Sequence, residues 1–289
     1  MRLAHFILAH KNPHQLERLV KRLVHPDADI YIHLDGKTDI EPFRYIADLP
    51  NVTFTEPRKP VGWADFTCIP VCLDAFDDII KTGKPYSHIN LLSGQDYPLK
   101  SAAEIQEFLF QHPDKTFMRY RDIYKNWPAT ISRLEKYHFG VYDFPLKWKL
   151  QWVVTKLPWL FPKKKLPNNL TAYGRSQWFT MNIEGARYAI DYMRNNPNVF
   201  RFFKQTWGCD EIVFQTILIN SHLKDTVIDD HLRYIRFKRG NANPDILTMD
   251  DVKILVGSGK FYARKFDTNV DEKIMDYFDQ LADKKQVEQ

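Results

Sequence analysis

The chain has little cysteine: its 289 residues include only Cys68, Cys72 and Cys209. Three thiols cannot build a disulfide framework, so Cys68 and Cys72, four residues apart on a predicted helix, are expected to be core residues or free thiols. Long apolar runs are lacking too, and the run within residues 1–10 is too short for a signal peptide or a membrane span. These absences favour a cytoplasmic protein in a reducing compartment.

Charge of one sign is not concentrated anywhere. Lys and Arg total 41 against 36 Asp and Glu, a scattered net charge of +5, and there is no basic low-complexity arm. Nucleic-acid binding is therefore not favoured. A hydrophobic content of 44% and a charged content of 27% are typical of a soluble globular protein. The length predicts one large domain over residues 1–289, with room for an insertion.

Predicted strands and helices alternate in the first half of the chain, which favours a mostly parallel sheet with helices on both faces, as in nucleotide-binding α/β folds. The predicted strands cover residues 4–8, 30–34, 52–54, 87–92 and 177–182. The predicted helices cover residues 14–23, 67–80, about 101–111, 184–194, about 210–220 and the C-terminus from about 270. The third helix opens with a capping box from Ser101 to Glu104.

Residues 119–171 are rich in Arg, Lys, Tyr and Trp and have no clean period, which indicates an insertion or a long functional loop. Within this segment, residues 147–165 interleave Trp, Leu and Phe with Lys, a composition that suits a membrane interface. The alternative is a loop that packs its Trp side chains on the protein body and leaves its lysines in solvent.

Near the C-terminus, Arg264 and Lys265 stand between the aromatic residues Phe261, Tyr262 and Phe266. A cation fixed by such packing needs an anion, and a diphosphate fits. The alternative is an amphipathic edge strand in which charges alternate with core residues.

Polar and glycine residues follow several predicted strands, where open α/β sheets bind ligands. Asp35 could accept hydrogen bonds from a ribose or a uracil, or it could cap the turn before Gly36. Trp63, after Gly62, could wall a sugar or base, or could plug the core. The stretch 90–99 includes Ser93 and Asp96, which either face a ligand or bond the backbone of a turn.

Adjacent carboxylates at Asp210 and Glu211 stand at the predicted start of a helix, where the positive helix end suits a general base but where acidic residues are also common for structural reasons. A divalent-metal site would be expected as Asp-x-Asp after a strand, yet Asp27-Ala28-Asp29 precedes its strand. A pair of cations is the simplest substitute, and the Arg264–Lys265 segment supplies it.

Seven stretches together resemble the core-2/I-branching N-acetylglucosaminyltransferase and peptide O-xylosyltransferase family, in a short bacterial-type form. They occur in family order and span nearly the whole chain: residues 7–11, 30–37, 58–63, 89–99, 176–179, 210–211 and 261–267. The resemblance implies a GT-A-type nucleotide-sugar-binding fold, inversion at the anomeric carbon and no metal requirement.

The resemblance also implies roles for individual residues of the site. The uracil and ribose would be held by Ile7, Leu8, Ala9 and Asp35, with Lys37 nearby. The donor pocket would be lined by Val61, Gly62 and Trp63, and the donor sugar would face Ser176, Gln177 and Trp178. Glu211 would be the base, and the diphosphate would be held by Arg264 and Lys265, with Arg239 as a further candidate. The xylosyltransferase branch has Asp at the position of Gln177.

The resulting prediction is a metal-independent inverting transferase. It would move a sugar, GlcNAc-like by preference, from a UDP-sugar to a saccharide or lipid-linked saccharide in surface polysaccharide or glycan synthesis, with peripheral membrane contact through residues 147–165. The alternative is a non-catalytic protein of the same fold that binds a sugar nucleotide or carbohydrate. A glycoside hydrolase is disfavoured, because adjacent residues 210 and 211 cannot supply two opposed carboxyl groups.

Overall fold

The computed structural model describes residues 1–287 except 143, 158, 160, 239 and 242. A seven-stranded sheet with the order β3-β2-β1-β4-β7-β6-β8 forms its centre. Strands β1 to β4 run parallel to one another, β7 runs antiparallel to both β4 and β6, and β8 pairs parallel to β6. These strands are β1 (Arg2–Ala9), β2 (Ala28–Leu34), β3 (Val52–Phe54), β4 (Tyr86–Ser93), β6 (Thr116–Asp122), β7 (Tyr173–Asn182) and β8 (Val227–Ile228).

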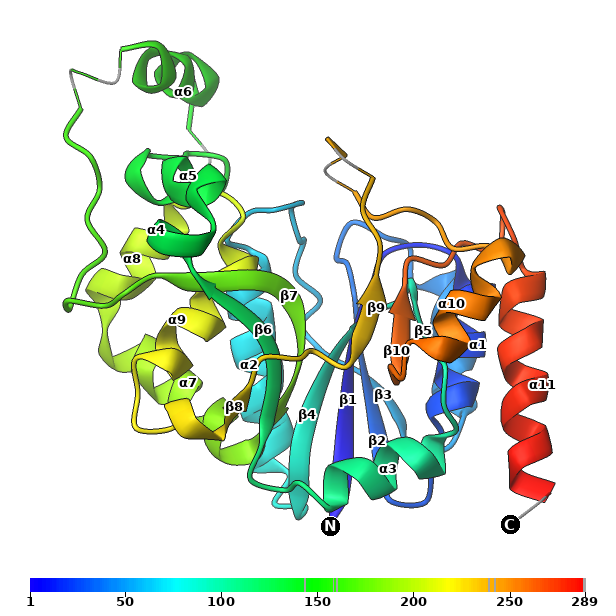
Figure 1. Cartoon of the computed structure of the whole chain (residues 1–289). Helices are drawn as coiled ribbons and strands as arrows, with labels where there is room; N and C mark the ends of the chain where they lie inside the picture. The colour runs from blue at the N-terminus through cyan, green and yellow to red at the C-terminus, as the bar shows by residue number, and fades with distance from the viewer. Residues whose placement is uncertain (143, 158, 160, 239, 242, 288–289) are drawn as a thin grey trace.

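Helices cover both faces of this sheet (Figure 1), which confirms the predicted α/β fold. One face carries α2 (Cys68–Lys81), α7 (Ile183–Asn195), α8 (Pro197–Lys204) and α9 (Val213–Ile219). The other face carries α1 (Pro13–Leu23), α3 (Ala102–Phe110), α10 (Val252–Gly257) and α11 (Lys273–Val287). Side chains of β1 alternate between the two cores, since Phe6 packs with the first set and Ile7 with the second.

A second, three-stranded sheet, β5-β10-β9, lies beside the carboxyl ends of β1 and β4 (Figure 1). Its strands are β5 (Asp96–Pro98), β9 (Arg233–Ile235) and β10 (Tyr262–Arg264). Because β10 is the central strand, the edge-strand interpretation of the Arg264 segment is wrong. Arg233 is fully buried and joins the two sheets, since its Nη2 donates to the backbone oxygens of Leu91 at 2.7 Å and Phe179 at 3.1 Å.

The helix starts follow local capping rules where the sequence signals them. The capping box is confirmed, because the Ser101 side chain accepts from the Glu104 N–H and the Glu104 carboxylate accepts from the Ser101 N–H. The predicted helix start at residue 210 is wrong. Cys209–Glu211 forms a 3₁₀ turn, η4, and Ile212, with φ of −128°, separates it from α9.

The segment 119–171 is more regular than its sequence indicates. It begins in β6 and continues with α4 (Ile123–Asn126), the 3₁₀ turn η2 (Pro128–Thr130), α5 (Ile131–Glu135) and α6 (Lys147–Lys156). Helices of four and five residues are too short to leave a periodic signal. Figure 1 shows α6 projecting beyond the rest of the molecule. No helix within the described residues is long and apolar enough to cross a membrane.

Candidate active site

A cleft of about 1130 Å³ opens at the carboxyl ends of β1, β2 and β4. These strand ends contribute Ala9, Asp35 and Ser93 to its lining. The small sheet contributes Arg264, and the opposite wall includes Glu211 on η4. The cleft therefore lies where ligands bind in open α/β sheets, and it brings together residues far apart in the sequence.

Asp35 both caps a turn and lines the cleft, so its two interpretations coexist. Its buried carboxylate accepts from the backbone N–H groups of Lys37 at 2.8 Å and Val61 at 3.3 Å, and the Lys37 ammonium donates to the Val61 carbonyl at 2.7 Å. The turn requires Gly36, because a Cβ there would fall 2.8 Å from the Arg58 carbonyl oxygen. Asp35, Lys37 and Val61 thus form one connected wall.

The end of β1 contributes Leu8, Ala9 and His10 to the cleft, but not the predicted Ile7. The Ile7 side chain is fully buried in the core on the α1 face, because alternate residues of a strand point to opposite faces. His10 was missed by the sequence reasoning. Desolvation and the charge of Lys11 lower the pKa of His10, as do the charges of Lys265 and Arg264, while the charge of Asp35 opposes them.

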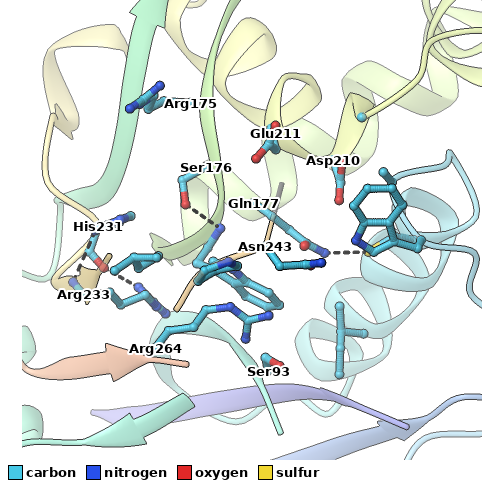
Figure 2. A pocket seen from close by; sticks show the side chains of 18 of the residues that line it. Ser93, Arg175, Ser176, Gln177, Asp210, Glu211, His231, Arg233, Asn243 and Arg264 are labelled. Carbon is cyan, nitrogen blue, oxygen red and sulfur yellow. Dashed lines mark hydrogen bonds between the residues drawn. The ribbon is translucent and has the colours of Figure 1, made fainter. Parts of the chain in front are cut away.

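Arg264 projects into the cleft with fixed geometry. Its Nη1 donates to the buried Asp96 carboxylate at 2.8 Å, and its guanidinium carbon lies 4.5 Å from the ring centroid of Trp178. Asp96 also accepts from the Ser93 N–H at 3.0 Å, so it bonds the turn as well as the cation. Figure 2 shows Arg264 at the same end of the cavity as Ser93, away from Glu211.

Lys265 follows Arg264 but is not among the residues that line the cleft. It is half-buried, and burial lowers its pKa, as do the neighbouring charges of Arg264 and Lys11. No carboxylate lies within 4.0 Å of its ammonium among the described residues. The two predicted cations are thus adjacent, but only Arg264 faces the cleft.

The residues predicted to face the donor sugar lie on β7, and those predicted to line the donor pocket lie on the loop before α2. Gln177 donates from its Nε2 to the Cys68 sulfur at 3.2 Å, and Trp178 is buried beneath Arg264. Trp63 is 67% exposed and packs edge-on against Trp207, with ring centroids 5.9 Å apart. The interpretation of Trp63 as a core plug is therefore wrong. Gly62, also in the lining, donates its N–H to the Thr67 hydroxyl at 2.7 Å.

Glu211 is held by an arginine that the sequence reasoning missed. The Arg133 Nη1 lies 2.8 Å from the Glu211 carboxylate, and the Arg133 guanidinium lies 4.5 Å from the ring centroid of Trp207 and 5.6 Å from that of Trp127. Arg133 comes from α5, inside the segment without a period. The partner of Glu211 is therefore a guanidinium from the inserted segment and not the end of a helix.

Asp210 lines the same cleft without a partner of this kind. Its Oδ1 is enclosed and has no hydrogen-bond partner among the described residues. Burial, and next the charge of Glu211, raise the pKa of Asp210 to about 7. The three cysteines are buried free thiols, as expected, and Cys68 also lines the cleft.

Residues 147–165, described except for 158 and 160, expose their indole rings. Trp148, Trp152 and Trp159 are 67%, 61% and 75% exposed, so the interpretation that they pack on the body is wrong. The lysines differ among themselves. Lys164 is buried and donates to the Gln205 carbonyl at 2.5 Å, and burial lowers its pKa to about 7. Lys164 therefore anchors the segment and cannot contact a membrane.

No cluster of three or more His, Cys, Asp and Glu side chains that could hold a metal ion occurs among the described residues. Asp29, at the amino end of β2, is engaged by Arg2 at 2.8 Å and Lys84 at 2.9 Å. Arg239, the further candidate for the diphosphate, lies outside the described residues.

The fold and cleft are those of an α/β protein with a ligand site at the carboxyl edge of its main sheet. The family model "Core-2/I-Branching enzyme" matches residues 3–255, so the chain belongs to this family of glycosyltransferases. Membership accords with the GT-A-type fold expected from the sequence.

Curated relatives include a xylosyltransferase of Ciona intestinalis, 23% identical in an alignment of 305 positions that covers 96% of this chain and 34% of the relative. Human xylosyltransferase 2 is 23% identical in an alignment of 303 positions that covers 96% of this chain and 33% of the relative. The chain spans about a third of the length of these relatives. Among solved structures, mouse xyloside xylosyltransferase 1 without ligand is similar with a TM-score of 0.36 and 10% identity, over 82% of this chain and 88% of that one.

Proposed function

We propose that the chain is an inverting glycosyltransferase that moves a sugar from a UDP-sugar to a saccharide hydroxyl without a divalent metal. The observation that carries the proposal is that Glu211 and Arg264 line one cleft from opposite walls. A base and a cation so arranged can act on the two ends of one displacement, the attacking hydroxyl and the departing phosphate.

The donor fits the end of the cleft formed by β1, β2 and the small sheet. Asp35 offers carboxylate oxygens to a ribose or a uracil N–H, beside Leu8 and Ala9. Arg264 offers a guanidinium to the diphosphate, and the adjacent Lys265, which does not line the cleft, adds a second positive charge close to it. These two cations would take the place of a metal ion in balancing the charge of the leaving nucleotide.

In the reaction step, the Glu211 carboxylate takes the proton from an acceptor hydroxyl as that oxygen attacks the anomeric carbon. The new glycosidic C–O bond forms on the face opposite the diphosphate while the bond to the UDP oxygen breaks, which inverts the configuration. UDP departs with the bonding electron pair, and Arg264 and Lys265 stabilise its charge. General base catalysis of this kind contributes roughly two to four powers of ten.

A GlcNAc-like donor and a role in surface polysaccharide or glycan synthesis remain parts of the proposal that rest on the family resemblance. The acceptor is proposed to be lipid-linked, at the cytoplasmic face of a membrane. The exposed Trp148, Trp152 and Trp159 support this, because indole rings at the headgroup level and nearby lysines favour binding to an anionic membrane surface.

The test of the donor is UDP release measured across a panel of UDP-sugars, with and without EDTA. Activity that persists in EDTA supports the proposal, and activity that requires added metal refutes metal independence. Sugar-nucleotide binding without UDP release from any donor would favour the non-catalytic alternative instead.

The assignment of the base is tested with Glu211→Gln. Asp230→Asn is the matched control, because Asp230 also lines the cleft but forms an ion pair with Lys260. Glu211→Gln should reduce transfer by at least about 100-fold with UDP affinity unchanged. Normal turnover by this variant would rule out the assignment.

Membrane contact is tested by co-sedimentation with vesicles that contain anionic lipid, using Trp148→Ser/Trp152→Ser. The double variant should lose most binding, and Tyr45→Ser, which removes an exposed ring of the η1 turn (Glu41–Asp48), should not. Equal sedimentation of all three proteins would refute the membrane surface.

A further inference from the structure

The Arg133 guanidinium, which holds Glu211, is itself held by aromatic rings. Its carbon lies over the ring of Trp207, 4.5 Å from the ring centroid, and over the ring of Trp127 at 5.6 Å. Arg133 is half-buried, and its Nη1 donates to the Glu211 carboxylate at 2.8 Å. Arginine suits this place better than lysine, because a planar guanidinium stacks on aromatic faces and is more weakly hydrated than an ammonium.

The backbone before η4 leaves room for this guanidinium. Gly208 has φ of +63°, and a Cβ on it would lie 2.7 Å from Arg133 Nη1. Glycine therefore serves two needs here, the left-handed backbone that precedes η4 and the space beside the guanidinium. Trp207 comes directly before this glycine and Glu211 soon after it, so the place of the Trp207 ring and that of the base are set by one short stretch of chain.

The same stretch is tied to the loop that lines the predicted donor pocket. The Gly208 N–H donates to the Ala64 carbonyl at 2.6 Å, and the Trp63 ring packs edge-on against that of Trp207. At its other end this loop bonds to the wall of the cleft formed by Asp35. Trp207 thus stands between the donor-pocket loop and the guanidinium that holds the base.

Core packing does not account for Trp207. Its side chain is half-buried, lines the cleft and belongs to neither hydrophobic core of the described residues. The ring contacts that the structure gives it are those with Arg133 and Trp63. A large ring placed against a guanidinium at the edge of a reaction cleft restricts the orientation of that guanidinium.

We propose that Trp207 is a positioning residue for the base. By fixing the orientation of the Arg133 guanidinium, it fixes the direction from which Nη1 donates to Glu211, and so keeps the carboxylate where it can take the proton of the acceptor. Trp127 supports the same guanidinium as a second ring. This inference rests on the proposed glycosyltransferase function and gives a role in it to a residue that does not itself react.

The experiment measures kcat, the KM for a probe acceptor and the affinity for UDP. UDP release from the most active donor of the UDP-sugar panel is followed with p-nitrophenyl monosaccharides as probe acceptors, and UDP affinity is measured by calorimetry. The variants are Trp207→Leu, Trp207→Phe, Arg133→Gln and the double variant Trp207→Leu/Arg133→Gln. The control is Tyr142→Leu, which removes a ring that lies 4.7 Å from the Lys204 ammonium in a pair outside the cleft lining.

Trp207→Leu should lower kcat about 5- to 30-fold and leave UDP affinity and the KM for the probe acceptor within about twofold. Trp207→Phe keeps an aromatic face and should retain at least about half of the wild-type kcat. In the Arg133→Gln background, the leucine replacement should cost less than about a further twofold, because Trp207 acts through Arg133. Tyr142→Leu should keep kcat within about twofold of the wild type.

Losses of the two single variants that multiply in the double variant would overturn the proposal, since a merely structural ring acts independently of Arg133. An unchanged kcat would also overturn it, as would a change confined to the KM for the acceptor, which would make Trp207 an acceptor contact. If Trp207→Leu fails to fold, Trp127→Leu enters the same cycle with Arg133→Gln under the same expectations. These outcomes leave the transferase intact, whereas normal turnover by Glu211→Gln, or a wild type that releases no UDP, refutes the proposed function and this role together.

Discussion

Replacing Asp210 by Asn should change how the stability of the protein depends on pH. The pKa of this carboxyl, 3.8 in an ordinary setting, is raised to about 7 by burial and by the charge of Glu211. Between these two values the folded protein binds a proton that the unfolded chain has released. The free energy of unfolding of the wild type therefore falls as the pH rises from about 4 to about 7, and Asn, which does not titrate, removes this loss.

The size of the effect follows from the same pKa difference. At about 1.4 kcal/mol per pH unit, a rise from 3.8 to about 7 corresponds to roughly 4 kcal/mol. The carboxyl partly reaches the surface of the cleft, so the expected effect is somewhat smaller. We expect the free energy of unfolding of Asp210→Asn, relative to that of the wild type, to increase by about 2–4 kcal/mol as the pH rises from 4 to 8. Glu211 is present in both proteins, so the difference in pH dependence between them comes from the carboxyl of Asp210.

Denaturant unfolding of the ligand-free proteins at pH 4.5, 6 and 8 measures this difference. The control is Asp77→Asn on α2, since hydrogen bonds from Arg194 and Lys81 lower the pKa of Asp77. Its variant should be less stable than the wild type above about pH 4, by no more than about 1 kcal/mol, with the deficit vanishing in acid. If the free energies of unfolding of the wild type and of Asp210→Asn change in parallel from pH 4.5 to 8, the inference that Asp210 is protonated in the folded protein over this range is refuted.

Three further changes test the contacts around the base and the inserted segment. Arg133→Gln should lower kcat about 10- to 100-fold with UDP affinity unchanged in calorimetry, because Glu211 loses its positioning contact; a change confined to UDP affinity would contradict this. Gly208→Ala should lower the free energy of unfolding by about 1 kcal/mol, because φ at this residue is +63°. It should also reduce kcat, because the added Cβ would lie 2.7 Å from Arg133 Nη1, and an unchanged kcat would contradict this second effect. Burial lowers the pKa of Lys164 to about 7, so the stability of the wild type relative to Lys164→Met should rise between pH 7 and 9.5. A difference in the free energy of unfolding by denaturant that stays constant over this range would refute the prediction.

Much of the fold could be predicted because buried parallel strands are continuous apolar runs. The runs at 4–8, 30–34 and 87–92 lie within β1, β2 and β4, and the helices between them keep one apolar face. The same reasoning located Asp35 and Ser93 at strand ends, since residues that follow parallel strands gather at one sheet edge. These parts of the prediction need only local sequence patterns.

The opposite wall of the cleft could not be predicted this way. Arg133 belongs to a five-residue helix in a segment without a period, and its contact with Glu211 depends on how that segment packs. The 3₁₀ turn of η4 likewise depends on the left-handed backbone of Gly208, which the sequence permits but does not require. Ile7 was assigned by resemblance, although strand alternation already pointed it toward the α1 core.

The charges around Arg264 explain why this end of the cleft suits a nucleoside diphosphate. Arg264 is paired with Asp96, and the negative charge of the same carboxylate also acts on the buried Arg233, together with that of Asp230. Lys265 adds a cation whose neighbours include Lys11 and Asp267. Five cations thus share three carboxylates among the described residues: Lys11, Arg233, Lys260, Arg264 and Lys265 against Asp96, Asp230 and Asp267. A surplus of two positive charges in a partly buried setting is costly in the empty protein, and a dianionic group placed against Arg264 removes that cost. A neutral carbohydrate in the same place would leave the surplus uncompensated, which favours a nucleotide sugar over a plain saccharide as the ligand at this end.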